Sequence, residues 1–199
     1  MTPRVSTRKD TRLALLEAGI NAMFEKGYTN TGISEVLKAV GVPKGSFYHY
    51  FESKEDFALE IINEFDREYR ADVLSVLSDR TLSPTARLKR YCKLNKEKFF
   101  EADCKRGCII GNLSQEMSGQ SERLRDRLRE VMNRWRQDFS ECIRQGQESG
   151  EFGNSFDAED MAEFFICGWQ GAMMRAKTTQ DLRPLDNFIE LMFEGLLKK

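Results

Sequence analysis

Apolar residues recur at intervals of three and four along most of the chain, which is the spacing of one face of an α-helix. The first run predicts a helix over residues 8–26, and Gly27 follows it in the place of a C-terminal cap. Its apolar positions are Leu13, Leu16, Ile20, Met23 and Phe24. No segment alternates apolar and polar residues convincingly, as a half-buried strand would. The pattern therefore predicts an all-α fold of about nine helices.

The next segment is typical of two short helices and the start of a long one. Ile33 lies in the first short helix, which ends at Gly41. Pro43 opens the second, because a proline in the first turn loses no helical hydrogen bond. Ser53 is the predicted cap of the long helix, with Asp56 three residues later as in a capping box. The apolar stripe of this long helix is Phe57, Ile61, Phe65, Tyr69, Val73 and Val76.

Polar caps mark the remaining helices. Their predicted starts are Ser83 with Pro84, Ser121, Asp157 and Pro184. Residues 103–119 follow a helix that ends near Glu101, and they are predicted to be irregular before the next helix begins.

Composition indicates a globular protein without a secretory signal or a membrane span. The N-terminal residues have no apolar run after their charges, and no uncharged apolar stretch of about 18 residues exists. Five cysteines without a framework spacing favour reduced thiols and a cytoplasmic location. The chain carries a net charge of −1, but residues 1–54 hold eight basic and five acidic side chains, or +3, which leaves −4 for the rest. A mildly basic head on an acidic body is compatible with a nucleic-acid partner.

Two short helices separated by "VGV" describe a helix-turn-helix, in which the second helix lies in the major groove of DNA. The residue types fit that chemistry. Gly45 lets the backbone approach DNA closely, and Ser46, Tyr48 and His49 can donate to phosphates or base edges. The inward-facing positions of the same helix are predicted to be Phe47 and Tyr50.

The stretch "TGISEVLKAVGVPKGSFYHYFESKEDF" resembles the TetR family of bacterial one-component regulators almost position by position. The resemblance covers roughly residues 8–58. It implies a DNA-binding domain over residues 1–54 and a helical domain for effector binding and dimerisation over residues 55–199. The implied DNA contacts are Thr31, Lys44, Gly45, Ser46, Tyr48, His49 and Lys54. Pro43 and Gly32 depart from the family pattern, since hydroxyl residues are usual there, and each departure can remove one phosphate contact.

The last two predicted helices suit the pairing of two copies of the chain. "MAEFFICGWQGAMMRA" is apolar nearly all round and therefore needs cover on more than one side. Gly168, Gly171 and Ala172 make a small-residue surface that lets another helix approach closely. The resemblance implies a homodimer through a four-helix interface, and the alternative is that both helices fill the core of a monomer.

Aromatic and methionine side chains in the same region suit a pocket for a small, mostly apolar effector, although they suit core packing too. The candidates are Trp135, Phe139, Trp169, Met173 and Met174. Asn112, Gln115 and Glu116 in "GNLSQEM" are also candidates, because polar groups beside an apolar run need partners.

Cys108 in "CKRGCIIG" is a candidate sensor. It follows Lys105 and Arg106, and positive charge nearby stabilises the reactive thiolate. The "GC-apolar-apolar-GNLSQE" pattern is similar to a subgroup of TetR-type repressors that includes regulators of the response to reactive electrophiles, in some of which a cysteine at this position does the sensing. The alternative is a cysteine that packs as a small apolar residue.

We expect no metal, no other cofactor and no catalysis. Cys104 and Cys108 lack a third and fourth ligand nearby, and the single histidine belongs to the helix-turn-helix. The other cysteines, Cys92, Cys142 and Cys167, lie among apolar neighbours and are predicted to be core. An enzyme would need a Gly-rich phosphate loop, a histidine partner for a cysteine or paired carboxylates, and the sequence offers none of these.

The sequence therefore predicts a TetR-type regulator, by the habit of that family a repressor, that binds a palindromic operator as a dimer and is released by a small-molecule effector. The effector is either an electrophile sensed at Cys108 or a reversibly bound apolar molecule. The rival hypothesis is a helical interaction module that never meets DNA. Strong salt dependence of DNA binding would separate the two, because phosphate contacts release counterions.

Overall fold

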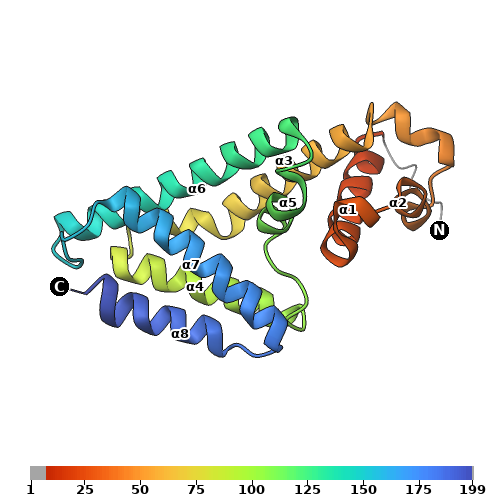
Figure 1. Cartoon of the computed structure of the whole chain (residues 1–199). Helices are drawn as coiled ribbons and strands as arrows, with labels where there is room; N and C mark the ends of the chain where they lie inside the picture. The colour runs from red at the N-terminus through yellow and green to blue at the C-terminus, as the bar shows by residue number, and fades with distance from the viewer. Residues whose placement is uncertain (1–7, 199) are drawn as a thin grey trace, which may run out of the picture. The chain divides into compact units, whose positions relative to one another are not determined.

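A computed structural model of the chain describes residues 8–198, and helices make up this part of the fold without any strand (Figure 1). The all-α prediction is confirmed. The eight α-helices are α1 (Arg8–Asn30), α2 (Ile33–Val40), α3 (Lys54–Asp72), α4 (Pro84–Glu101), α5 (Ile109–Met117), α6 (Glu122–Glu148), α7 (Ala158–Thr179) and α8 (Arg183–Leu191). Two 3-10 helices lie between α-helices, η1 (Lys44–His49) and η2 (Leu74–Ser78), and the π-helical turn η3 (Met192–Leu196) follows α8.

The chain divides into two compact units. The first consists of the residues up to Arg67 together with Asn112–Leu128, and the second of Glu68–Gly111 together with the residues from Arg129 onward. The division falls within α3, α5 and α6, so each of these helices contributes to both units. The domain boundary predicted between residues 54 and 55 does not coincide with this division, and it stays a prediction.

The first turns of α3 belong to the first unit because they pack on α1. Gly19 of α1 lies so close to the side chains of Phe57 and Ile61 that a Cβ atom at this position would come within 2.6 Å of the Ile61 Cδ1 atom. Phe57 also joins an aromatic cluster with Phe47 and Phe51, whose ring centroids lie 4.7–5.3 Å apart. These contacts form the core of a head built from α1, α2, η1 and the start of α3.

Most of the predicted helix ends are confirmed. The Ser53 Oγ accepts a hydrogen bond from the Asp56 backbone at 3.0 Å, and the Ser83 Oγ accepts one from the backbone of Ala86 at 3.3 Å. Gly27 has a φ of 75°, which ends the regular part of α1 where the sequence predicted it. Ser121 and Asp157 likewise cap α6 and α7.

Four local predictions are wrong. The helix that follows Pro43 is a 3-10 helix, and Pro43 is its cap with extended ψ. Phe51 takes the buried place predicted for Tyr50, which is half-buried. The helix α3 ends at Asp72, so Val73 and Val76 are buried beyond its end. The segment predicted to be irregular contains the helix α5.

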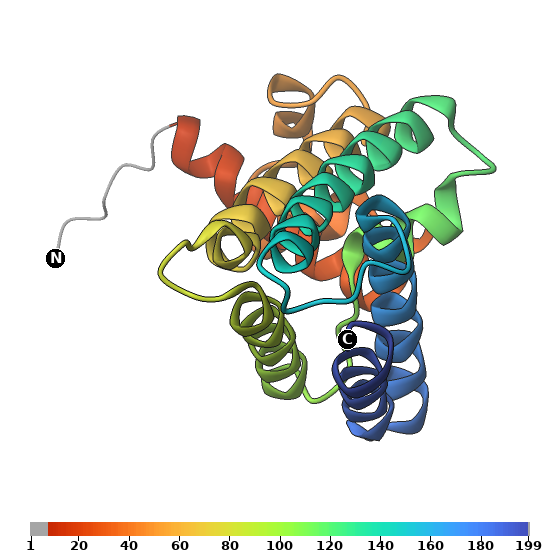
Figure 2. The ribbon, with the colours of Figure 1, turned by 90° about the vertical axis from the view of Figure 1, so that its left-hand side faces the viewer.

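The second unit is organised around aromatic side chains from α4, α6, α7 and α8. Tyr91, Phe139 and Phe165 are buried, with ring centroids 4.7–6.2 Å apart. The helices α7 and α8 run side by side in both views, and α4 packs against α8 (Figures 1 and 2). Gly168 allows the close approach of α8, because a Cβ atom there would meet the Phe188 ring at 2.6 Å.

None of the helices in residues 8–198 has an apolar stretch sufficient to traverse a lipid bilayer.

Candidate functional site

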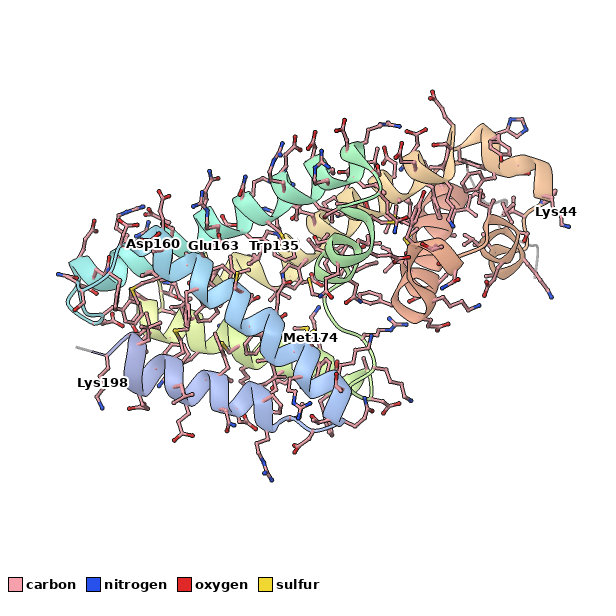
Figure 3. All side chains as sticks on the ribbon, viewed as in Figure 1. Lys44, Trp135, Asp160, Glu163, Met174 and Lys198 are labelled. Carbon is pink, nitrogen blue, oxygen red and sulfur yellow. The ribbon has the colours of Figure 1, made fainter. Side chains whose placement is uncertain are left out.

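The exposed face of η1 presents several hydrogen-bond donors to solvent. Lys44, Tyr48 and His49 are exposed, Tyr48 to 66%, and the Lys44 side chain projects from the head in Figure 3. The opposite face holds Phe47, which is fully buried and fixes the orientation of the segment. Gly45 is exposed, and no described atom beyond its own segment would lie within 4 Å of a Cβ atom there. An ammonium, a phenol and an imidazole on one rigid turn can donate to phosphates and base edges.

Two other residues predicted to contact DNA are engaged within the head. Thr31 is only 2% exposed, and its hydroxyl donates to the carbonyl oxygen of Gly27 at 2.7 Å. The Lys54 Nζ donates to the carbonyl oxygen of Thr29 at 3.1 Å and lies 4.6 Å from the centre of the Tyr28 ring. Partial burial lowers the pKa of Lys54 from its ordinary value. Both side chains hold the turn between α1 and α2, whereas Ser46 is half-buried on η1.

The same turn is held by Glu116 of α5. Its carboxylate oxygens accept hydrogen bonds from the backbone N–H groups of Tyr28 and Thr29, each at 2.8 Å. Burial by itself would raise the pKa of Glu116, but these hydrogen bonds and the nearby Lys54 ammonium outweigh it and lower the pKa. The placement of Glu116 in an effector pocket stays a prediction, and in the structure its carboxylate accepts hydrogen bonds from two backbone donors of the head.

The first turn of α6 adds charged contacts to the start of α3. Arg123 donates to Glu55 at 2.9 Å and to Asp56 at 2.8 Å, and the Ser121 hydroxyl donates to Glu55 at 2.5 Å. Asn112 also belongs to the first unit. The stretch Asn112–Leu128 is therefore attached to the head by a carboxylate, a hydroxyl and a guanidinium.

The second unit contains a buried polar network among its aromatic rings. The Tyr69 hydroxyl donates to the Asn95 Oδ1 at 2.8 Å, so the Tyr91 hydroxyl, 2.8 Å away, must donate to Tyr69. The Asn95 amide donates to the Tyr91 carbonyl oxygen at 3.0 Å. Burial raises the pKa of both tyrosines, and the neighbouring Cys108 acts in the same direction. The hydroxyls therefore stay protonated at neutral pH.

Three predicted effector residues lie around this network, in what we call the tyrosine cluster, which consists of Tyr69, Tyr91, Asn95, Cys108, Trp135, Phe139 and Trp169. The Trp135 ring lies 4.8 Å from Tyr69, and the rings of Phe139 and Trp169 lie 4.7 and 6.1 Å from Tyr91. Met173 is buried on α7 one turn after Trp169.

Two donors beside the tyrosine cluster have no hydrogen-bond partner among the described residues. They are the Nε1 atom of Trp169, which is 2% exposed, and the Nε2 atom of Gln170. A buried donor without a partner costs about 1–3 kcal/mol.

Tyr91 and Asn95 were not among the residues predicted to line the site. They lie four residues apart in "YCKLN" and therefore on one face of α4, which the structure buries. A phenol and an amide on a face that also buries Leu88 and Phe99 were a detectable signal of a buried polar network.

Cys108 immediately precedes α5, and its sulfur accepts a hydrogen bond from the Gly111 N–H at 3.5 Å. Burial of the sulfur raises the pKa of this thiol, although the N–H groups of Gly111 and Ile110 act against that effect. The expectation that Lys105 stabilises the thiolate is not supported, because its ammonium pairs with Asp103 at 3.4 Å. The thiol of Cys108 is protonated at neutral pH.

The remaining cysteines differ from one another in exposure, and all of them are free thiols. Cys92 and Cys142 are buried as predicted, and burial raises the pKa of Cys142 to about 11. Cys167, which was predicted to be core, is exposed on α7.

An exposed apolar stripe follows α7. Phe164 is 60% exposed and Met174, which Figure 3 labels, is 56% exposed. Cys167 and Gly171 lie between them at intervals of three and four residues. Leu191 of α8 is 72% exposed. Gly168 was predicted to share a small-residue surface with Gly171. It does not belong to the exposed stripe, because the Phe188 ring of α8 covers it. Large apolar side chains left open at helical spacing are typical of a surface that another copy or partner covers.

Comparison with known proteins gives matches along nearly the whole chain. Residues 15–61 match the model of "Bacterial regulatory proteins, tetR family", and residues 84–192 match "Tetracyclin repressor-like, C-terminal domain". The transcriptional repressor DhaR of Mycobacterium sp. (strain GP1) is 36% identical over 96% of this chain and 94% of its own. The transcriptional regulator AcuR of Cereibacter sphaeroides is 38% identical over 88% of this chain and 80% of its own.

Solved structures of two bacterial regulators are also similar to the chain. The regulatory protein TetR from Rhodobacter sphaeroides is 38% identical and superimposes with a TM-score of 0.85, over 92% of this chain and 96% of its own. The reduced form of E. coli NemR is 28% identical, with a TM-score of 0.81 over 93% of this chain and 97% of its own. With both family models matched and both units accounted for, the chain belongs to the tetR family of bacterial regulatory proteins and is a DNA-binding transcriptional regulator.

Proposed function

We propose that the chain is a cytoplasmic, non-enzymatic repressor that binds a palindromic operator as a dimer and leaves it when a small molecule occupies the tyrosine cluster. The observation that carries the DNA half of this proposal is the exposed donor face of η1 over the buried Phe47. Relatives named as repressors, DhaR and NemR among them, support the direction of regulation.

The proposed DNA contacts are the exposed residues of η1, namely Lys44, Gly45, Tyr48 and His49, with Ser46 at the edge of that face. Lys54 joins them if its ammonium exchanges the Thr29 carbonyl for a phosphate. Thr31 is not included in the proposed surface, because its buried hydroxyl donates to the carbonyl oxygen of Gly27. One head reads one half-site, so a dimer with heads about 34–36 Å apart matches a palindrome.

The proposed effector is a small neutral molecule with an apolar body and an oxygen acceptor. Aromatic rings from α3, α4, α6 and α7 offer the apolar contacts, and the unpaired donors of Trp169 and Gln170 offer hydrogen bonds to the oxygen. Release of the operator needs a differential affinity of a few kcal/mol between two states of the dimer.

A covalent variant of the same proposal uses the Cys108 thiol, which is near enough to the two tyrosines to help raise their pKa. The sulfur would add to an electron-poor carbon of the effector and pass its proton to the adduct. Burial works against this route because the thiolate is the nucleophile and burial disfavours it. Loss of the effector response in Cys108→Ser would favour the covalent route, and retention would favour reversible binding.

Operator binding is tested by replacing donors on η1. We expect Lys44→Ala and Tyr48→Ala each to weaken binding to an operator selected from random DNA by about 1–3 kcal/mol. Lys44→Ala should also lower the slope of log K against log salt concentration by about one ion if Lys44 meets a phosphate. Fluorescence anisotropy with a labelled duplex measures both quantities.

Lys93→Ala is the matched control, since it removes a 74% exposed ammonium from α4 in the second unit. Binding should be unchanged in this variant. Unaltered affinity in both η1 variants would contradict the proposed DNA surface, and failure of the wild-type chain to select any duplex would contradict the proposed function itself.

A further inference from the structure

The helix α4 is a basic element in an otherwise acidic part of the chain. Its residues, Pro84–Glu101, include six basic and two acidic side chains, a balance of +4. Residues 55–199 together carry −4, so the residues of this range outside α4 carry −8. Because acidic surroundings repel an acidic molecule, such a molecule is favoured only where basic side chains gather.

One face of α4 combines lysines with a phenylalanine, and we call it the lysine face. Its members recur at intervals of four, three and four residues, which places them on the same side of the helix, and they are Lys89, Lys93, Lys96 and Phe100. The Lys93 side chain is 74% exposed, and Phe100 is 64% exposed. The lysine face therefore offers both positive charge and an aromatic ring to solvent.

A groove of about 340 Å³ lies at the C-terminal end of the lysine face. It is lined by Lys93, Lys96, Glu97 and Phe100 of α4 and by Leu182, which lies between α7 and α8. Phe100 and Leu182 give the groove apolar surface, and the two lysines give it ammonium groups. Aromatic side chains dominate the energetics of interfaces, so cover of the exposed Phe100 ring would contribute much of the binding.

Two of the three ammonium groups are available to a further carboxylate. Lys93 pairs with Glu97 at 3.8 Å on the helix surface, and an exposed pair of this length contributes little. The Lys89 ammonium lies 5.2 Å from the centre of the Phe193 ring, and no carboxylate pairs with it among the described residues. Lys96 differs, because it pairs with Asp186 and so joins α4 to α8. A carboxylate can therefore approach Lys89 and Lys93 without breaking a strong contact.

The length of the lysine face indicates the kind of ligand. Lys89 and Phe100 are eleven positions apart, which spans about 16 Å along a helix. An extended peptide covers this distance with about five residues, whereas a small carboxylate would reach only one end. A nucleic acid is disfavoured, because its evenly charged backbone would meet Glu97 in the groove. A peptide can instead alternate acidic and apolar side chains.

We propose that the lysine face and its groove bind an acidic peptide segment of a partner protein. A large apolar side chain of the segment would pack on Phe100 and Leu182, and carboxylates beside it would pair with Lys89 and Lys93. This interaction goes beyond the proposed function and does not depend on it, since it requires neither an operator nor an effector.

A fluorescein-labelled peptide with a central Leu-Phe pair and three glutamates on each side tests this proposal. We expect the chain to bind it, by fluorescence anisotropy, at least tenfold more tightly than the same peptide with lysines for glutamates. A peptide with Gly-Gly for Leu-Phe should also bind at least tenfold more weakly. Binding should weaken at least fivefold between 50 and 300 mM salt, because salt screens exposed charges.

Two substitutions separate the charged from the apolar contribution. Lys93→Glu should weaken binding of the glutamate peptide at least tenfold and reduce its salt dependence, and Phe100→Ala should weaken it at least fivefold with the salt dependence unchanged. Arg80→Glu is the matched charge control, because Arg80 is 67% exposed and its ion pair with Glu141 is 3.7 Å long. Phe156→Ala is the matched apolar control, because Phe156 is 58% exposed and does not line the groove. Neither control should change peptide affinity by more than twofold.

Absence of saturable binding at low salt, or equal effects of Lys93→Glu and Arg80→Glu, would overturn the proposal. Displacement of the peptide by unlabelled duplex DNA would overturn it too, since it would assign the face to nucleic acid. A change in the sedimentation of Phe100→Ala would assign the groove to a second copy of the chain, with the same consequence. Lys93→Glu should leave operator binding intact, so failure of the wild-type chain to bind any duplex concerns the proposed function alone.

Discussion

At the scale of single residues, protonation decides what the tyrosine cluster can do. The hydroxyls of Tyr69 and Tyr91 are kept protonated by burial, so they act as donors in a chain that ends on Asn95. Burial also raises the pKa of the Cys108 thiol. A site of neutral donors with a protonated thiol favours recognition of a neutral acceptor over electrostatic capture of an anion.

The raised pKa of Cys108 gives a prediction for thiol reactivity. Because alkylation needs the thiolate, Cys108 should react with iodoacetamide more slowly at pH 7 than free cysteine does. Below the thiol pKa the thiolate fraction rises about tenfold per pH unit, so the rate should rise by that factor between pH 7 and 8. Peptide mass spectrometry measures the rate at this position.

Cys108→Ser should abolish labelling of that peptide and leave labelling of the exposed Cys167 unchanged. Labelling of Cys108 at pH 7 faster than that of free cysteine would show an activated thiolate. This result would favour the covalent mechanism over reversible binding of the effector.

At the scale of elements, glycine decides how closely the helices approach. A Cβ atom on Gly19 would clash with Phe57 and Ile61. A Cβ atom on Gly168 would clash with Phe188, and one on Gly111 with Gln170. A glycine in a helix costs about 1 kcal/mol relative to alanine in propensity. The close packing that it allows outweighs this cost where two helices meet without space for a methyl group.

Gly19→Ala should therefore destabilise the protein despite its better helix propensity. The added methyl group would meet the Phe57 ring and come within 2.6 Å of Ile61, and overpacking of a core costs about 1–3 kcal/mol. Urea denaturation followed by circular dichroism measures the free energy of unfolding.

The control for this experiment is Gly45→Ala, because no described atom lies within 4 Å of its added methyl group. It should leave the free energy of unfolding within about 0.5 kcal/mol of the wild-type value. Equal stability of the two variants would contradict tight packing of α1 on α3.

At the scale of the whole molecule, each compact unit buries an apolar core, yet the second unit leaves apolar area open. Phe164, Met174 and Leu191 are more than half exposed on α7 and α8. Large apolar side chains exposed at helical spacing are typical of a surface that another copy covers. A second copy that covers the stripe would also supply the second head that a palindromic operator needs.

Phe164→Glu should convert the proposed dimer to a monomer, since a carboxylate at the interface would be buried without a partner. Operator affinity should fall on the order of 100-fold, because one head contacts only one half-site. Sedimentation velocity and anisotropy measure the two effects.

Phe100→Glu is the matched control, because Phe100 is 64% exposed on α4 and lies outside the stripe. It should sediment like the wild type and bind operator equally well. A wild-type chain that sediments as a monomer, or a Phe164→Glu variant that remains dimeric, would contradict the proposed interface.

Much of the fold was predictable because its signals are local. Helical spacing and caps such as Ser53, Ser83 and Asp157 identified the helices, and the residues after Thr31 identified the helix-turn-helix. The helix α5 was missed because its nine residues are flanked by glycines and cysteines that resemble a loop. Only part of the tyrosine cluster was predicted from the sequence. Tyr91 and Asn95 were not, because their contacts are with side chains on other helices.

The sequence by itself determined that this chain is helical, that it carries a DNA-reading head and that Phe47 anchors the reading segment, because these properties depend on neighbours within a few residues. Only the tertiary structure showed that Glu116 accepts hydrogen bonds from the backbone of Tyr28 and Thr29 and that burial raises the pKa of Cys108. A carboxylate is a pocket residue or a clamp according to which backbone donors reach it, and a thiol is reactive or quiet according to its burial. Both depend on contacts between segments far apart in the chain, which no local pattern encodes.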